Sequence, residues 1–218
     1  EAVVAAASDP RNLQADITAL DALVTRARAL EAMANEVKLT RLREVLEQHA
    51  IPRDPDARLL IFTEHKDTLD FLCGDGKEGR PVGKLVEWGV RTTQIHGGMK
   101  VGDRDTPGTR LHAERDFKER AQVMVATEAA GEGINLQFCW LMVNYDIPWS
   151  PVRLEQRMGR IHRYGQQHAC FIFNFVTDNT REGRVLQKLL HRLEVIREQL
   201  DSDQVFDVIG EVVPGTLL

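Results

Sequence analysis

A short run of polar and basic residues is the part of this sequence whose types and spacing best suit chemistry. The run QRMGRIHR at residues 156–163 follows a Ser-Pro pair, which is typical of a helix N-cap and first helical residue. A helix that begins there places Gln156, Arg160 and Arg163 on one face, at i, i+4 and i+7. Two guanidiniums and an amide on one face suit a polyphosphate, because arginine stays charged and binds phosphate oxygens bidentately.

Gly159 lies in the middle of that predicted helix, where glycine costs about 1 kcal/mol relative to alanine. A glycine at such a position indicates that a backbone or a ligand approaches closely. The alternative is a solvated basic helix face, which Arg153 and Arg157 would join. The Q-x-x-G-R-x-x-R spacing, directly after an apolar run and a proline-capped helix start, favours the phosphate site over that alternative.

A second segment, Ala126–Leu136, could contact a phosphate or a sugar. Gly131 and Gly133 permit a tight turn that approaches a ligand closely. Thr127 offers a hydroxyl and Asn135 an amide for such contacts. On its own, a Gly-x-Gly after an apolar run could be only a turn.

Weaker signals come from two further segments, 94–99 and 62–66. His96 and the backbone amide of Gly97 could meet a phosphodiester, although a lone histidine before Gly-Gly is more often structural. Thr63 could serve the same purpose or could cap the helix that follows it. These two segments support a phosphate-binding function only together with the two stronger segments.

Apolar runs that alternate with helix-like segments must position these residues. The predicted strands are Leu59–Phe62, Thr92–Ile95, Val123–Ala126, Leu141–Val143 and Phe171–Val176. The predicted helices are Asn12–Ala50, Lys66–Cys73, Arg110–Glu119, Val152–Ile161 and Glu182–Leu200, and the predicted exposed loops are Gly74–Gly83 and Gly102–Thr109. Fully apolar strands between amphipathic helices predict an α/β fold with a parallel sheet that helices cover on both faces. Ligands of such sheets gather at the carboxyl ends of the strands, where all of these segments lie.

The composition of the chain excludes several classes of protein. The chain has 218 residues, 43% hydrophobic and 28% charged, with a net charge of −5, which excludes a collagen-like, wholly disordered or disulfide-scaffold protein. A negative net charge provides no overall attraction to nucleic acid, so binding to nucleic acid would need a local basic patch. Cys73, Cys139 and Cys170 are far apart, which predicts reduced thiols and no metal site. No apolar run is long enough to span a membrane. A start at Glu1 rather than Met suggests a fragment.

In this order and spacing, the segments resemble the second, C-terminal RecA-like lobe of superfamily-two helicases, over about Lys38–Val176. Within that superfamily the sequence is most similar to the bacterial Swi/Snf-type ATP-dependent DNA translocases. The resemblance is carried by ATEAAGEGINLQ at 126–137, NYDIPWSPVRLEQRMGRIHRYGQ at 144–166, and the tail VLQKLLHRLEVIREQL…VFDVIGEV from residue 185. The Arg-Tyr-Gly-Gln ending at 163–166 is especially typical of the Swi/Snf branch.

The resemblance implies roles at matching positions. Arg160 and Arg163 resemble the catalytic arginine fingers that reach the γ-phosphate of ATP bound to the other lobe, and Gln156 is expected to organise the nucleotide site. The other residues expected at the cofactor are Gly131, Gly133 and Asn135. The residues expected to face the DNA backbone are Thr63, His96, Gly97 and Thr127. The sequence departs from the family pattern at two places. The loop Val101–Thr109 is longer than usual. Glu128 stands where Asp or Arg is also common, and we assign it no direct role.

The resemblance also implies how the chain is organised and what it works with. We expect a helical lead-in at 1–55, a RecA-like lobe at 56–178 and a helical C-terminal extension at 179–218. The sequence has no G-x-x-x-x-G-K-[ST] phosphate-binding loop, so ATP and its Mg²⁺ are expected to be held by an absent first lobe, which is also a partner. The fragment alone is therefore expected to bind ATP weakly without hydrolysing it.

The expected nucleic acid is double-stranded DNA without sequence preference, and the expected location is the bacterial cytoplasm, at the nucleoid. The alternatives are the lobe of an RNA helicase and a non-catalytic module that binds a nucleotide or a protein. The presence of both Arg160 and Arg163 argues against the non-catalytic module.

Overall fold

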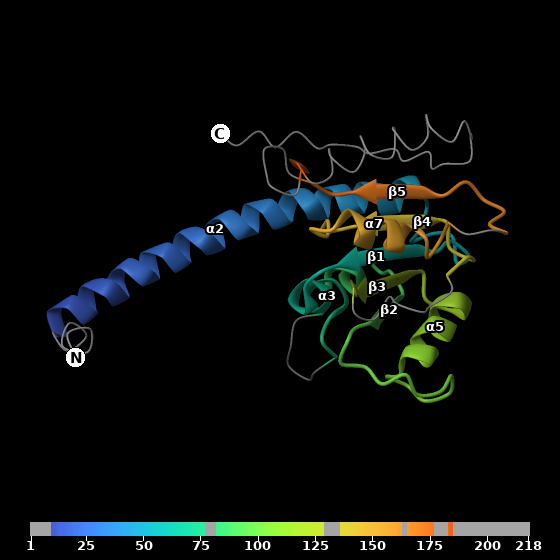
Figure 1. The fold of residues 1–218 in the computed structure, drawn as a ribbon, viewed down its shortest axis with the longest axis horizontal. Helices are drawn as coiled ribbons and strands as arrows, with labels where there is room; N and C mark the ends of the chain where they lie inside the picture. The colour runs from blue at the N-terminus through green and yellow to red at the C-terminus, as the bar shows by residue number, and fades with distance from the viewer. Residues whose placement is uncertain (1–9, 77–81, 129–135, 163–164, 177–182, 185–218) are drawn as a thin grey trace. The chain divides into compact units, whose positions relative to one another are not determined.

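A parallel sheet is the centre of the fold. The computed structural model describes residues 10–76, 82–128, 136–162, 165–176 and 183–184. Five strands lie in the order β2-β3-β1-β4-β5, and every neighbouring pair is parallel. Figure 1 shows them following one another across the sheet. Their bounds are β1 Leu59–Thr63, β2 Thr92–Ile95, β3 Val123–Thr127, β4 Leu141–Asn144 and β5 Phe171–Asn174. The predicted RecA-like α/β fold is confirmed.

The inner strands are apolar because they are buried on both faces. Every residue of β1, β3 and β4 is buried, whereas the edge strands β2 and β5 are only partly so. This is the pattern that a covered parallel sheet imposes on a sequence. Among the described residues, no helix is long and apolar enough to cross a membrane.

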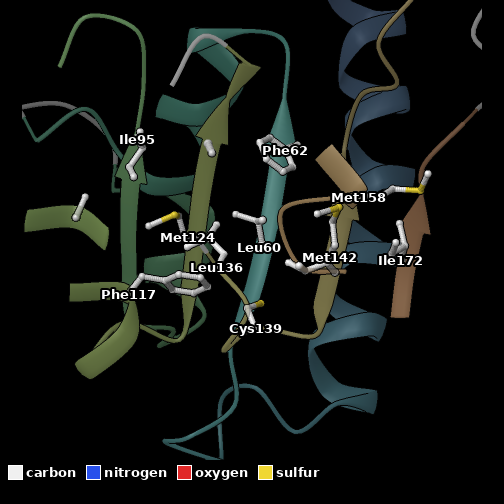
Figure 2. Packing of buried hydrophobic residues seen from close by; sticks show 13 residues of the cluster. Leu60, Phe62, Ile95, Phe117, Met124, Leu136, Cys139, Met142, Met158 and Ile172 are labelled. Atoms are coloured by element: carbon white, nitrogen blue, oxygen red, sulfur yellow. The ribbon is translucent and has the colours of Figure 1, made fainter. Parts of the chain in front are cut away.

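Five helices are described, of which α3 and α5 pack on the sheet. Their bounds are α2 Pro10–Gln48, α3 Lys66–Cys73, α4 Lys84–Glu87, α5 Arg110–Glu119 and α7 Pro151–Met158. A core cluster joins Leu60 and Phe62 of β1 to Phe117 of α5 and Met158 of α7 (Figure 2). The helix α3 packs on β1, β2 and β3, and its buried leucines lie outside that cluster. The chain divides into two compact units, Glu1–Val45 and Leu46–Leu218, and the sheet belongs to the second.

Most predicted elements agree with the structure, and the differences lie at their ends. The bounds of α3, α5 and β2 match the prediction, while α4 was not predicted. The strands β1, β3 and β4 each extend one residue further, and β5 ends at Asn174 instead of Val176. The predicted helix at 182–200 falls almost entirely outside the described residues. The domain boundaries at residues 55 and 178 stay predictions.

The loop at Gly102–Thr109 ends in a well-defined helix start. Its residues are exposed up to Gly108, as predicted. Thr109 is the N-cap of α5, and its hydroxyl accepts a hydrogen bond from the His112 N–H. The same hydroxyl lies 2.6 Å from the Asp103 carbonyl, so the loop folds back on its own end. The unusual length of this loop therefore does not shift the predicted start of the helix.

The cysteines are thiols without a disulfide in this structure. Cys139 is fully buried and donates towards the Leu141 carbonyl at 3.2 Å. Burial raises the pKa of Cys139 to about 12, and burial also raises that of Cys73 to about 12. Both therefore stay protonated near neutral pH, as structural thiols do.

Candidate functional site

Polar side chains end four of the five strands at their carboxyl ends. Thr63, Thr127, Asn144 and Asn174 are the last residues of β1, β3, β4 and β5. They lie side by side in the register, since Thr63 pairs with Thr127 and Asn144 pairs with Asn174. All are buried, with exposed fractions of 0 to 8%. Because the strands are parallel, the residues that follow each of them meet at this same edge.

Arg157 of α7 reaches into this edge and binds residues that end or follow the strands β1, β3 and β4. Its Nη2 donates to Glu64 Oε1 at 3.1 Å, and its Nε donates to Glu128 Oε2 at 2.8 Å. A second bond joins Nη2 to the same Glu128 oxygen. Its Nη1 donates to Asn144 Oδ1 at 3.3 Å and to the Asp146 carbonyl at 2.8 Å. We call these residues the Arg157 network.

Burial explains why this network is complete. Arg157 is only 2% exposed, and a buried charge is tolerated only when it is paired and hydrogen-bonded. The carboxylates of Glu64 and Glu128 supply the opposite charge, and the Phe62 ring lies 5.2 Å from the guanidinium carbon. The sequence alternative that placed Arg157 on a solvated basic face is therefore wrong, and Arg157 cannot be counted in a phosphate-facing patch.

Thr63 is tied into the same edge. Its hydroxyl donates to Asp146 Oδ2 at 2.5 Å and accepts from the His65 N–H at 3.3 Å. The N-cap of α3 is His65, so the predicted cap by Thr63 is wrong. Thr63 is also 0% exposed, which leaves no surface for the expected contact with DNA. Its hydroxyl instead holds Asp146, the second residue after β4, in place.

The helix that carries Arg157 begins as predicted and ends earlier. Ser150 is the N-cap of α7, and Pro151 is its first residue. The helix ends at Met158, and Gly159 is its C-cap with ordinary right-handed dihedral angles. The prediction that Gly159 lies inside the helix is therefore wrong. A turn follows, in which the Arg160 N–H donates to the Arg157 carbonyl at 3.0 Å.

The residues expected to meet phosphates lie on either side of that helix end. Gln156 is exposed and Arg160 is half-buried. Within the described part of the chain, neither side chain has a hydrogen-bond or ion-pair partner, in contrast to Arg157. The polar groups of Gln156 and Arg160 are thus left available, and a free amide and guanidinium are a donor set that fits phosphate oxygens.

The loop after β2 is braced from α5. Arg110 Nε donates to the Met99 carbonyl at 3.1 Å, and its Nη2 donates to the Gly97 carbonyl at 3.2 Å. A Cβ on Gly98 would lie 3.3 Å from His96 Nδ1, so only glycine fits there without displacing the imidazole. Burial, with Lys66 and Arg110 contributing, lowers the pKa of His96. His96 is half-buried and Gly97 exposed, and their contact with DNA stays a prediction.

Other predicted site residues are not positioned by this structure. Gly131, Gly133, Asn135 and Arg163 lie outside the described residues. Thr127 is described and is 8% exposed, so only a small part of its side chain reaches the surface.

The sequence reasoning missed the Arg157 network and one further contact. Glu128 received no role, although it binds the buried guanidinium. The available signal was a carboxylate directly after a buried strand, found at Glu64 and again at Glu128. Gln166 was noted only for its resemblance, yet its Nε2 lies within hydrogen-bond reach of the carbonyls of Gln137, Cys139 and Ile161, at 2.9, 3.3 and 3.0 Å.

Comparison with known proteins identifies the family. The model of the helicase conserved C-terminal domain matches residues 37–165. A similar relative is the uncharacterized ATP-dependent helicase YqhH of Bacillus subtilis, 40% identical over 150 residues, which are 67% of this chain and 24% of the relative. The RNA polymerase-associated protein RapA of Serratia proteamaculans is 35% identical over 134 residues, which are 61% of this chain and 13% of RapA.

An RNA helicase is also among the relatives. The pre-mRNA-processing ATP-dependent RNA helicase PRP5 of Mycosarcoma maydis is 31% identical over 145 residues, which are 66% of this chain and 11% of PRP5. The chain thus spans about a quarter or less of each of these relatives. A solved structure, the C-terminal part of the Fun30 ATPase domain, superposes with a TM-score of 0.56 at 22% identity, covering 69% of this chain and 44% of that one, and supports the fold. The chain therefore belongs to the helicase conserved C-terminal domain family, the second lobe of superfamily-two helicases.

Proposed function

We propose that this chain is the C-terminal motor lobe of an ATP-dependent double-stranded DNA translocase. In this proposal it supplies Arg160 and Arg163 to ATP and Mg²⁺ held by a first RecA-like lobe. Its strand-end loops contact the DNA backbone. Family membership, the relatives named above and the placement of these loops at the carboxyl edge of the sheet support the proposal.

The observation that carries the proposal is the contrast between two arginines on either side of one helix end. Arg157 is 2% exposed and fully paired inside the protein. Arg160 is half-buried, and its side chain has no partner within the described residues. A guanidinium that stabilises an external phosphate needs a fixed backbone and N–H groups that are not bonded within the protein. Among the described residues, Arg160 meets both conditions.

Bound ATP supplies the phosphoryl group and the charge that develops during its transfer. Arg160 donates hydrogen bonds to the γ-phosphate oxygens, where it stabilises that charge. Gln156 lies on the preceding turn and orients the phosphates through its exposed amide. Arg163, Gly131, Gly133 and Asn135 remain proposed partners of the nucleotide by resemblance.

The nucleic-acid contacts are proposed for the loop after β2. The exposed Gly97 and the half-buried His96 lie on a loop whose shape Arg110 holds. Because the pKa of His96 is lowered, its imidazole is neutral near neutral pH and acts as a hydrogen-bonding group rather than as a charge. Such contacts to phosphates are independent of sequence. Thr127 is a lesser candidate, and Thr63 is excluded by its burial.

ATP turnover by the full-length protein tests the proposal. With duplex DNA present, Arg160→Ala and Arg163→Ala are each expected to reduce turnover by about a thousandfold or more. Binding to duplex DNA, measured by fluorescence anisotropy, is expected to stay near that of the unaltered protein. Arg153→Ala is the matched control, because Arg153 is an exposed arginine of the nearby helix α7 and has no side-chain partner among the described residues. Near-normal turnover in Arg160→Ala would refute the finger assignment.

The same assay separates the alternatives. The likeness to PRP5 favours an RNA helicase lobe as the second candidate. Stimulation of turnover by duplex DNA, with movement along it and no strand separation, supports the translocase. Stimulation by RNA alone supports the second candidate. A full-length protein without any ATP turnover would indicate a non-catalytic module.

A further inference from the structure

The first part of α2 carries a row of exposed apolar side chains. The helix is 39 residues long (Figure 1). Large apolar residues follow one another along it at spacings of four, three and four: Leu13, Ile17, Leu20 and Val24. A helix turns by about 100° per residue, so these side chains fall within about 60° of one another. Their exposed fractions lie between 43 and 60%. We call these four residues the α2 stripe.

Acidic side chains border the α2 stripe on both sides. Between Leu13 and Thr25 the charged residues are Asp16 and Asp21, and both are exposed. Helix geometry places Asp16 at one edge of the stripe and Asp21 at the other. The hydroxyls of Thr18 and Thr25 lie away from the stripe and donate to carbonyls one turn earlier, at 2.9 and 2.8 Å. The stripe is therefore an apolar surface with a negative rim.

The rim disfavours a second copy of this chain as the occupant. In a parallel pair of helices, Asp16 would face Asp21 of the second copy, five residues further on, where coiled coils place their interhelical charge pairs. Two carboxylates at that position repel each other. In the antiparallel direction, a second stripe brings no cation to either carboxylate, because segment 13–25 has no Lys or Arg. Self-association thus leaves the rim unpaired or repelled.

A membrane surface is disfavoured for the same reason. Helices that lie in a membrane interface carry Lys and Arg beside their apolar face, which are attracted to anionic lipids. Asp16 and Asp21 would be repelled by such lipids. The charges of the rim instead complement a surface that carries cations on both sides of an apolar centre.

We propose that the α2 stripe is the docking surface for an amphipathic helix of a partner protein. That helix presents Leu or Ile at heptad spacing, with Lys or Arg on both sides of them. Its apolar residues remove the stripe from water, and its cations pair with Asp16 and Asp21. The stripe is about 17 Å long, so one docked helix is expected to bind with a Kd of about 1–100 μM. This role is independent of the proposed ATP site.

Binding of two helical probe peptides to the full-length protein tests the proposal. The basic probe has about four heptads with Ile and Leu at the apolar positions and Lys at the flanking positions. The acidic probe is the same peptide with Glu at the flanking positions. Fluorescence anisotropy is expected to show binding of the basic probe that weakens as KCl is added, and binding of the acidic probe that is about tenfold weaker or more.

Truncation of the stripe tests the apolar contact. The double variant Ile17→Ala with Leu20→Ala removes its centre and keeps good helix formers at both positions. The basic probe is expected to bind this variant about tenfold more weakly or worse. Val37→Ala is the matched control, because Val37 is an exposed apolar residue of the same helix on another face, and it is expected to leave binding unchanged.

Reversal of the rim tests the charge preference. The double variant Asp16→Lys with Asp21→Lys leaves the stripe intact and is expected to prefer the acidic probe over the basic one by about five- to tenfold. Because this variant gains a binding activity, a loss of folding cannot imitate the result.

The outcomes decide between a partner helix and the other occupants. Binding of the basic probe that depends on the stripe and reverses with the rim supports the docking surface. No binding to the full-length protein, or equal binding after truncation of the stripe, overturns it. A dimer of the unaltered protein that the truncation dissociates, seen by analytical ultracentrifugation, assigns the stripe to a second copy and also overturns it. ATP turnover of the truncated variant is expected to stay normal, so this proposal and the Arg160 assignment fail independently.

Discussion

Arg157 and Arg160 are separated by two residues, and their different burial decides whether each guanidinium is paired inside the protein. The guanidinium of Arg157 is desolvated, so it needs charge partners inside the fold, and it forms ion pairs with Glu64 and Glu128. The guanidinium of Arg160 keeps contact with solvent and stays unpaired among the described residues. From the sequence, Arg157 was assigned only to the alternative of a solvated basic face, because spacing alone does not tell which face of a short helix meets the sheet.

The hydroxyl of Thr63 provides a test at the same scale. Thr63→Val removes the donor to Asp146 Oδ2 and leaves this half-buried carboxylate with one hydrogen bond fewer. We expect the free energy of unfolding to fall by about 1–3 kcal/mol, measured by urea denaturation of this chain. Thr63→Ser keeps the hydroxyl and is expected to lose much less. An unchanged unfolding free energy in Thr63→Val would show that this bond does not stabilise the sheet edge.

Elements were predicted better than their ends. Apolar runs identified the strands because a covered parallel sheet demands continuous hydrophobicity, and the bounds of α3 and α5 followed from clear helix patterns. The polar ends Thr63, Thr127 and Asn144 were read as loop because their side chains are hydrophilic, although they continue the ladder. The network they join is made of residues far apart in the chain, and no local pattern predicts such contacts.

The turn after α7 depends on Gln166, which gives a prediction for that element. Its amide nitrogen lies close to the carbonyls of Gln137, Cys139 and Ile161 and so fastens the chain beyond Arg160 to the segment before β4. Gln166→Ala is expected to lower the free energy of unfolding by about 1–3 kcal/mol, because partly buried carbonyls lose their donor. The exposed neighbour Gln167 provides the control variant Gln167→Ala, expected to unfold like the unaltered chain. Equal stability of the two variants would contradict the fastening role.

The pH dependence of the stability of the chain follows from two half-buried histidines. Burial lowers the pKa of His49, which lies against the Phe171 and Phe173 rings, and also that of His96, below the ordinary value of 6.5. The unfolded chain therefore takes up protons first, so stability is fully present above about pH 6.5 and falls as the pH drops below it. Urea midpoints measured between about pH 7.5 and 5.5 check this. His49→Phe is expected to flatten the decline, and an equally steep decline would contradict the assignment to His49.

Charge gives the second whole-molecule prediction. The net charge of −5 provides no general attraction to DNA, and Arg157 is withdrawn from the surface by its ion pairs. This chain alone is therefore expected to bind duplex DNA weakly and to lose it readily as salt rises. Fluorescence anisotropy of a labelled duplex at increasing KCl measures both. Tight binding that survives high salt would show a nucleic-acid surface that the charge of the chain does not reveal.

Single-turnover ATP cleavage by the full-length protein is the sharpest test of whether Arg160 acts on the transferred phosphate. With ATP bound in advance and duplex DNA present, the measured rate isolates the chemical step from binding and product release. Arg160→Ala is expected to slow this step by about a thousandfold or more, and Arg153→Ala is expected to leave it unchanged. Equal cleavage rates in the two variants would show that Arg160 does not act on the transferred phosphate.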